Sequence, residues 1–149
     1  MEIERKFLIN QLPSNLNQYE ALTIEQGYLC TDPVVRIRQQ NNDYFLTYKS
    51  KGFLSREEVN LPLTKEAYLH LRKKADGHMI SKTRYLIPIE ASLKIELDIF
   101  HGIHEPLILA EIEFETEQQA NSFSPPSWFG EDVTYSSQYH NSTLSKKNN

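Results

Sequence analysis

Charged and apolar residues alternate along nearly every segment of this chain that has the composition of a β-strand. The first such segment, MEIERKFLIN, places Glu2, Glu4 and Lys6 at every second position, with mostly apolar residues between and after them. Successive side chains of a strand point to opposite faces, so one face of this strand is charged and the other is mostly apolar. A strand of this kind belongs in a sheet whose apolar face is buried.

The same alternation returns in the later strand-like segments. Charged residues two positions apart occur as Arg36 and Arg38, Lys49 and Lys51, Arg56 and Glu58, Lys82 and Arg84, Lys94, Glu96 and Asp98, and Glu111, Glu113 and Glu115. A solvated sheet face would explain any one of these segments. It explains the whole set poorly, because solvated faces usually mix Ser, Thr, Asn and Gln with the charges. These faces are almost purely Arg, Lys, Glu and Asp.

The expected elements are mostly strands, with a few short helices. We expect eight strands, at residues 2–9, 23–30, 34–40, 44–51, 55–63, 78–89, 92–100 and 107–115. The residues NND at 41–43 predict a hairpin turn. A helix is expected over 64–75 with Thr64 as its N-cap, and another follows Thr116, which forms a capping-box pattern with Gln119. Short helical turns are expected at 10–20 and early in the polar tail, and the last few residues are expected to be disordered.

Like charges at this spacing repel one another unless an opposite charge lies between them. The basic pairs at 36–38 and 49–51 lie on the two arms of one predicted hairpin, so their charges gather in one place. An anion would relieve their repulsion. The acidic pairs at 2–4 and 111–113 pose the opposite problem, which a divalent cation usually resolves.

A closed antiparallel barrel satisfies both requirements, and closure leaves no sheet edge exposed. Its charged faces would point into a wet lumen, and its apolar faces would point outward under helices. Phosphate oxygens bind Arg and Lys, while the oxygen ligands of Glu and Asp suit Mg²⁺ or Mn²⁺. A lumen with a basic and an acidic wall therefore suits a polyphosphate together with its metal.

Taken in order, these charge motifs resemble the CYTH superfamily, also called the triphosphate tunnel metalloenzymes. The resemblance runs from residue 2 to about residue 144, and DVTYSSQYHNSTL is similar to the segment that closes the family's domain. It implies a mainly β fold (α+β), in which a closed eight-stranded antiparallel β-barrel has a charged lumen and a few flanking helices. A single domain would span residues 1–149. Members of the family hydrolyse or cyclise triphosphates with a divalent metal.

The resemblance also implies roles for individual residues. The implied metal ligands, for Mg²⁺ or Mn²⁺ with two ions per active site, are Glu2, Glu4, Glu58, Asp98, Glu111 and Glu113. The implied substrate-binding residues are Lys6, Arg36, Arg38, Lys49, Lys51, Arg56, Lys82 and Arg84. Of these, the implied catalytic residues are Lys6, Lys82 and Arg84. Asn60 stands where many relatives carry another acidic residue, which weakens the expectation of a complete second metal site.

A few further residues have alternative interpretations. Tyr28 matches a tyrosine common in the family, and both a lumen and a core position are open to it. Trp128 is expected to pack rather than to form a platform for thiamine. The histidines show no metal-ligand pairing beyond two that are three positions apart, and all are expected on the surface: His70, His78, His101, His104 and His140.

The function that these motifs imply is metal-dependent hydrolysis of inorganic triphosphate, or of a related organic triphosphate, by phosphoryl transfer. The alternatives are a class IV-type adenylyl cyclase, a thiamine triphosphatase and a non-catalytic polyphosphate- or nucleotide-binding module. Cyclisation of ATP needs an adenine pocket and thiamine triphosphate needs an aromatic surface, and no motif supplies either. A binding module needs only the basic residues, so the acidic motifs favour an enzyme.

Composition narrows the setting of the protein. A net charge of −4 gives no overall attraction to nucleic acid, so no such partner is expected. The single cysteine, Cys30, excludes a disulfide framework within the chain. No apolar run has the length of a membrane span, and the charge motif begins at residue 2, where a signal peptide would have a basic region followed by an apolar run. We therefore expect a cytoplasmic protein that binds a small triphosphate and no membrane. A monomer and a homodimer both remain open.

Overall fold

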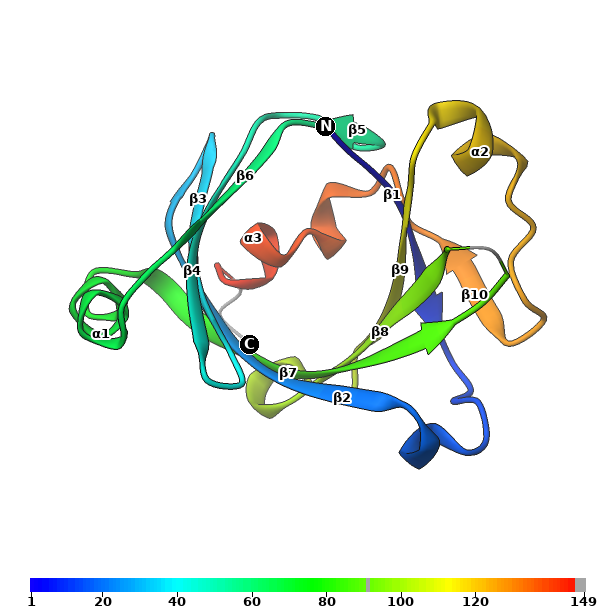
Figure 1. The fold of residues 1–149 in the computed structure, drawn as a ribbon, viewed down its shortest axis with the longest axis horizontal. Coiled ribbons are helices and arrows are strands. Elements are labelled where there is room, and N and C mark those ends of the chain that lie inside the picture. The colour runs from blue at the N-terminus through cyan, green and yellow to red at the C-terminus, as the bar shows by residue number, and fades with distance from the viewer. Residues whose placement is uncertain (91, 147–149) are drawn as a thin grey trace.

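The computed structural model describes residues 1–90 and 92–146. Its main feature is one antiparallel sheet that curves into a barrel (Figure 1). Its strands are β1 (Glu2–Ile9), β2 (Glu20–Thr31), β3 (Val34–Gln40), β4 (Asp43–Lys49), β5 (Ser55–Arg56), β6 (Glu58–Pro62), β7 (Asp76–Pro88), β8 (Lys94–Phe100), β9 (Ile108–Phe114) and β10 (Phe129–Asp132). Its helices are α1 (Lys65–Arg72), α2 (Glu117–Ser122) and α3 (Asn141–Leu144), with 3₁₀ turns at Leu16–Gln18, Gly102–His104 and Ser137–Tyr139. None of the described helices is long and apolar enough to cross a membrane. The expected disorder of the last residues concerns 147–149, which lie outside the described residues.

Strands β5 and β6 bridge the gap between β4 and β1 and nearly close the sheet into a ring. The strand order is β10-β1-β9-β8-β7-β2-β3-β4-β6, and β5 pairs with β1. Arg56 of β5 lies opposite Glu2 of β1, while Glu58 of β6 lies opposite Lys49 of β4. Only Glu57 separates β5 from β6, so this stretch links β4 to β1 and nearly closes the predicted antiparallel barrel.

The number of strands differs from the predicted eight, because the described residues form ten. The strand predicted over 55–63 is interrupted at Glu57, whose backbone N–H donates to the Ser50 hydroxyl at 2.9 Å instead of continuing a ladder. The other additional strand, β10, pairs with the second half of β1, outside the ring. Its sequence, FGED, is too short to show an alternating pattern, so the sequence does not predict it.

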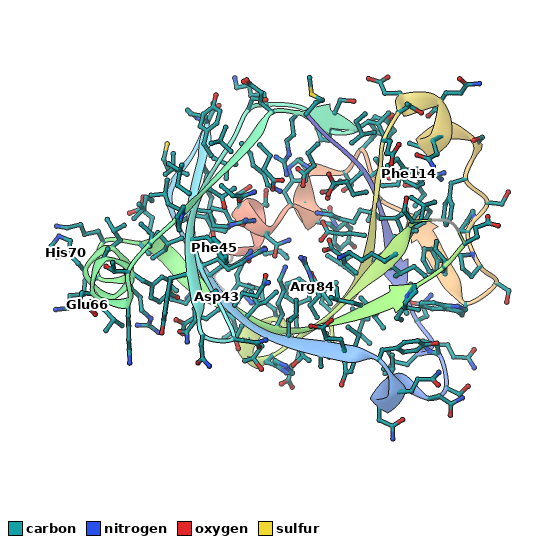
Figure 2. The ribbon with its side chains drawn as sticks, viewed as in Figure 1. Asp43, Phe45, Glu66, His70, Arg84 and Phe114 are labelled. Atoms are coloured by element: carbon teal, nitrogen blue, oxygen red, sulfur yellow. The ribbon has the colours of Figure 1, made fainter. Side chains whose placement is uncertain are left out.

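The outward faces of β1, β8 and β9 carry the larger of two apolar cores. Leu97 and Ile112 are fully buried there, and Phe114 lies on the side of β9 toward α2 (Figure 2). Arg5 shares this face of β1 and donates from Nη1 to two carbonyl oxygens at the C-terminal end of α2, at 3.0 Å each. The apolar faces therefore point outward under a helix, as the alternation predicts.

Helix α1 covers the outside of β3 and β4, and it begins at the predicted signal (Figure 1). The Thr64 hydroxyl accepts a hydrogen bond from the backbone N–H of Ala67 at 3.1 Å, which confirms the N-cap. The buried Tyr68 donates from its hydroxyl to Glu25 of β2 at 2.7 Å. Arg72 donates to both carboxylate oxygens of Glu25, at 2.9 Å each, so side-chain bonds tie α1 to the barrel wall.

The C-terminal segment (residues 133–145) enters the barrel at one end and closes it. Figure 1 shows α3 within the ring of strands. The inward faces become apolar at this end: Phe100 lies two positions beyond Asp98, and Leu109 lies two positions before Glu111. His104 holds the segment through a 2.8 Å hydrogen bond between Nε2 and the Leu144 carbonyl oxygen. The apolar cluster that results contains Tyr28, Val34, Ile80, Phe100, Leu109, Val133 and Leu144.

Candidate functional site

A cavity of about 310 Å³ occupies the lumen of the barrel, and most of the side chains that line it are charged. Figure 2 shows Arg84 pointing into this lumen from β7. The predicted substrate-binding residues on the cavity wall are Lys6, Arg36, Arg38, Lys49, Arg56, Lys82 and Arg84. The predicted metal ligands on the wall are Glu2, Glu4, Glu58, Glu111 and Glu113. The barrel therefore brings together charge motifs that lie more than 100 positions apart in the sequence.

Lys51 lies outside the lumen, contrary to its predicted role in substrate binding. Strand β4 ends at Lys49, and the chain then turns through Gly52, whose φ of 141° favours glycine. The Lys51 side chain is 83% exposed, and its nearest opposite charge is Asp32, with Nζ 3.5 Å from a carboxylate oxygen. Alternation assigns a side chain to a face only while the strand continues.

Asp98 lies behind the cavity wall, so it is not the wall ligand that the sequence predicts. Its carboxylate accepts hydrogen bonds from Arg84 Nε at 2.7 Å and Arg84 Nη2 at 2.9 Å, and Lys82 Nζ lies 2.7 Å away. Burial alone would raise the pKa of Asp98, but Arg84 and Lys82 outweigh burial and lower this pKa. Asp98 is therefore the counter-ion that orients two basic residues of the wall.

The basic residues of the wall are crowded and buried. Burial, with Arg36 and Arg84 nearby, lowers the pKa of Arg38 to about 9. Burial also lowers the pKa of Lys82 to about 7, although Asp98 opposes the change. Desolvation and like charges both disfavour a cation, so an anion in the lumen would stabilise these side chains.

Arg36 has a buried donor that no described residue accepts from. Its Nη2 donates to the Thr47 hydroxyl at 3.1 Å, but its Nε makes no hydrogen bond with any described residue. Buried polar atoms in native proteins almost always have a partner, so this atom suits a site for an anion. The Thr47 hydroxyl in turn donates to Asn60 Oδ1 at 2.5 Å, which makes Asn60 a neutral part of the wall.

Two carboxylates on the opposite side of the lumen form no ion pair within the described part of the chain. Glu4 and Glu113 lie directly opposite each other on β1 and β9, so they share the inward face. Burial, then Glu111 and Glu2, raises the pKa of Glu4 well above its usual value. Burial, then Glu2, raises the pKa of Glu113. Oxygen ligands with this excess of negative charge suit a hard divalent cation.

The other predicted ligands on the wall are paired with basic residues of the lumen. Lys49 Nζ lies 3.1 Å from a Glu2 oxygen and 3.4 Å from a Glu58 oxygen, and Lys6 Nζ lies 3.4 Å from a Glu111 oxygen. Among residues 1–90 and 92–146, no three acidic or histidine side chains are gathered as a complete set of metal ligands. Glu96 also lines the cavity, with an oxygen 3.4 Å from Arg84 Nη1. The described acidic wall thus offers two carboxylates without an ion pair and four that share cations.

The C-terminal segment contributes wall residues that the sequence does not predict. Lys6 Nζ donates to the Tyr139 carbonyl oxygen at 3.2 Å, and Lys82 Nζ donates to Asn141 Oδ1 at 3.0 Å, so two predicted catalytic residues also hold this segment. The only signal in the sequence is the resemblance to the family's closing segment, because these residues are polar and show no period. The missed wall residues are His140, Asn141 and Ser142.

The expectation that every histidine lies on the surface is wrong for two of them. His104 is buried beneath α3, and His140 is half-buried and lines the cavity. Burial, with Lys6 nearby, lowers the pKa of His140 to about 4, so its ring is neutral at neutral pH. The same ring lies beside Phe53, with the two centroids 5.3 Å apart. The exposed histidines are His70, His78 and His101.

Tyr28 combines the two positions that the sequence leaves open. It is buried in the apolar cluster at the closed end, and it also lines the cavity. Its hydroxyl accepts a hydrogen bond from Gln26 Nε2 at 3.1 Å, and Gln26 Oε1 accepts from Arg38 Nε at 2.8 Å. Trp128 packs on Phe129 with ring centroids 4.8 Å apart, which agrees with its expected packing role.

Comparison with known proteins gives one consistent result. The CYTH domain family matches residues 1–148. The chain is 41% identical over 146 residues to an inorganic triphosphatase of Nitrosomonas europaea, which covers 96% of this chain and 95% of that protein. It is 34% identical over 154 residues to an inorganic triphosphatase of Acetivibrio thermocellus, which covers 97% of this chain and 93% of that protein.

Solved structures agree with these sequence matches. The crystal structure of the inorganic triphosphatase NE1496 aligns with a TM-score of 0.73 at 37% identity, over 99% of this chain and 95% of that one. A putative adenylyl cyclase from Hippeastrum, described as having a dominant triphosphatase activity, aligns with a TM-score of 0.63 over 81% of this chain and 83% of that one. Its sequence identity is 15%, so this second likeness shows the fold alone.

Proposed function

Because this chain belongs to the CYTH domain family, we propose that it is a metal-dependent triphosphatase that hydrolyses inorganic triphosphate inside its barrel. The observation that carries the proposal is a single cavity with a crowded basic wall and an acidic wall that is only partly neutralised. Two relatives that match almost the whole chain are inorganic triphosphatases, which supports the same substrate.

The basic wall accounts for binding of the phosphate chain. Arg and Lys donate charge-assisted hydrogen bonds to phosphate oxygens, and Arg does so with a fixed fork of donors. The buried Nε of Arg36, which has no partner in the described part of the chain, would donate to such an oxygen, while Gln26 holds Arg38 in place at 2.8 Å. Burial, then the charges of Arg36 and Arg84, lowers the pKa of Arg38, and a triphosphate in this wall would oppose that change by supplying negative charge.

The acidic wall fits Mg²⁺ or Mn²⁺, and we propose two ions per active site with substrate. Glu4 and Glu113, whose pKa values are raised by burial and then by neighbouring carboxylates, would hold a cation together with Glu2 and Glu111. When bound, such ions neutralise phosphate oxygens and activate water for in-line attack. Glu58 and the neutral Asn60 lie on the wall beside them, so this part of the site has fewer charges to offer a second ion.

The residues proposed as catalytic act by charge and position. Lys6, Lys82 and Arg84 are each fixed by carboxylates, with Glu111 3.4 Å from Lys6 and Asp98 2.7 Å from both other residues. Fixed positive groups need little reorganisation as charge develops on the transferred phosphoryl group. Asp98 contributes by holding two of them, and therefore acts as a positioning residue.

The decisive experiment compares three substrates with one preparation of the protein. Tripolyphosphate, ATP and thiamine triphosphate are incubated with Mg²⁺ or Mn²⁺, and orthophosphate, pyrophosphate and cyclic AMP are measured. We expect orthophosphate from tripolyphosphate, and no turnover after EDTA treatment until metal is restored. Cyclic AMP as the main product from ATP would replace the proposal with a cyclase. Tight binding of tripolyphosphate without any product would replace it with a binding module.

We also propose a cytoplasmic location for this protein. A chain with one cysteine, Cys30, is typical of proteins that work in a reducing compartment, so we expect the protein in the cytoplasm. Fractionation of the native cells, with detection of the protein by antibody, tests this expectation.

A further inference from the structure

Asn141 lies at the start of α3, and two hydrogen bonds to residues of the barrel wall orient its side chain. Its Oδ1 lies 3.0 Å from Lys82 Nζ and 3.1 Å from Gln26 Nε2. Both partners are deeply buried, with Lys82 1% exposed and Gln26 0% exposed, so neither can turn to water. The Asn141 amide is therefore held between two fixed groups of the wall.

The hydrogen-bond chemistry of these partners fixes which end of the amide faces them. Arg38 has donors only, so the Gln26 atom that it contacts at 2.8 Å must be the carbonyl oxygen. The NH₂ group of Gln26 then faces Asn141, and the Lys82 ammonium is also a donor. Two donors require an acceptor, so the Asn141 oxygen points to the wall and its NH₂ group points away from it.

That NH₂ group is a donor at the closed end of the lumen. Asn141 lines the cavity, and its Nδ2 has no hydrogen-bond partner within residues 1–90 and 92–146. Beyond it the inward faces are apolar and packed with Leu144, so the polar part of the lumen ends here. Lys6 Nζ, bound to the neighbouring Tyr139 carbonyl oxygen at 3.2 Å, belongs to the same end.

We propose that the Asn141 amide donates a hydrogen bond to the terminal phosphoryl group of the bound triphosphate, and that Asn141 is a substrate-binding residue. The inference rests on the proposed function, because it adds a substrate-binding residue to the same site. The basic residues attract phosphate from many directions, whereas an amide with one fixed N–H direction recognises a phosphate oxygen at one place. The same amide also positions Lys82 directly and Arg38 through Gln26, so one residue of the C-terminal segment organises the end of the site.

The test separates two roles of this amide: its NH₂ group donates to phosphate, and its oxygen anchors Lys82 and Gln26. Asn141→Asp keeps an oxygen for Lys82 and Gln26 but replaces the free NH₂ group with a second oxygen. We expect the melting temperature of the free protein to be kept, while the dissociation constant for tripolyphosphate rises at least about tenfold by calorimetry. Asn141→Ala removes both roles, so it should weaken binding and also lower the melting temperature.

Matched controls exclude a general effect of charge or of the segment. Ser142→Asp places a new carboxylate on the adjacent wall residue, and it should weaken tripolyphosphate binding much less than Asn141→Asp. Thr143→Ala, in the same helix, should bind like the natural protein. Equal weakening by the two Asp variants, or binding by Asn141→Ala within about twofold of the natural protein, would overturn the inference.

Binding and turnover are measured separately so that the two proposals can fail separately. If the natural protein binds tripolyphosphate but releases no orthophosphate, the triphosphatase proposal fails and the comparison of dissociation constants still decides the role of Asn141. If hydrolysis occurs and all Asn141 variants bind normally, only the inference about Asn141 fails. If tripolyphosphate does not bind at all, both fail.

Discussion

Glu4 is one of the two lumen carboxylates that form no ion pair with any described residue, and it is the more buried of the two. Burial, with Glu111 and Glu2 nearby, raises its pKa, so the ionised side chain disfavours the folded state of the free protein. If it holds metal, Glu4→Gln should reduce tripolyphosphate turnover at least about a hundredfold. The melting temperature of the Glu4→Gln variant at pH 7 should equal or exceed that of the natural protein. Orthophosphate release and thermal unfolding measure the two effects.

The sign of the pH dependence follows from the raised pKa. A carboxylate with a raised folded-state pKa destabilises the protein above that pKa, and the effect vanishes below the ordinary value of 4.5, where both states are protonated. Any gain in stability from Glu4→Gln should therefore disappear in acid. Glu131→Gln, on the exposed part of β10, is the control and should change neither measurement. Full activity of the Glu4 variant would show that this carboxylate is no essential ligand.

The alternating sequence pattern predicts that both Lys49 and Lys51 bind phosphate, whereas the structure places only Lys49 in the lumen. Substituting each lysine in turn tests the difference. Lys49 lies in the lumen within 3.1 Å of a Glu2 oxygen, whereas Lys51 is 83% exposed. Lys49→Ala should raise the KM for tripolyphosphate by about tenfold or more, since a charge-assisted contact is lost. Lys51→Ala should leave KM and kcat unchanged. Similar increases in KM for both variants would mean that the loop after β4 moves Lys51 into the lumen when substrate binds.

At the scale of elements, the inner and outer faces of the strands follow from the sequence because alternation is a local property. Neighbouring positions on β1 send Glu4 inward and Arg5 outward whatever the rest of the chain does. The C-terminal segment has no such pattern. Asn141 bonds with Lys82 and Gln26, which lie 59 and 115 positions earlier, and only the closed barrel brings them together. Non-local docking of a polar segment is therefore the part of the site that the sequence leaves open.

The attachment of α1 to the barrel depends on one carboxylate of β2. Tyr68 and Arg72 both donate to Glu25, and these bonds lower the pKa of the Glu25 carboxyl even though burial acts in the opposite direction. Glu25→Gln should reduce the free energy of unfolding at pH 7 by about 1 kcal/mol, a modest value because the pair is partly exposed. Urea titration of the two proteins measures the difference.

The lowered pKa of Glu25 also sets the pH window of this effect. Its stabilising contribution is complete above the ordinary value of 4.5 and is lost as the pH falls through the lowered folded-state value. The natural protein and Glu25→Gln should therefore converge in stability in acid. Glu20→Gln, an exposed carboxylate at the start of the same strand, should not change stability at either pH. A difference between natural protein and variant that persists in acid would assign the effect to packing rather than charge.

At the scale of the whole molecule, the net charge of −4 conceals a strongly basic wall. Basic side chains face the lumen from seven positions, while many acidic residues lie on the exterior, among them Glu20, Glu105 and Glu117. Total charge describes the field far from a protein, and the arrangement of charges inside a cavity describes what it binds. A small polyanion that fits the lumen should therefore bind despite the negative charge of the whole.

Because the cavity gathers cations from most of the barrel, an anion matched to it should stabilise the entire fold. A ligand that binds only the native state contributes about 2.7 kcal/mol at a concentration one hundred times its dissociation constant. For a domain of this size, that corresponds to a rise in melting temperature of roughly 5–10 °C. Tripolyphosphate should produce this rise, and orthophosphate at equal ionic strength should produce much less, because one phosphate group contacts only part of the wall. Differential scanning calorimetry with both anions, and with sodium chloride at the same ionic strength, gives the comparison. Equal rises with tripolyphosphate and orthophosphate would mean that the lumen responds to negative charge in general and is not matched to a chain of phosphates.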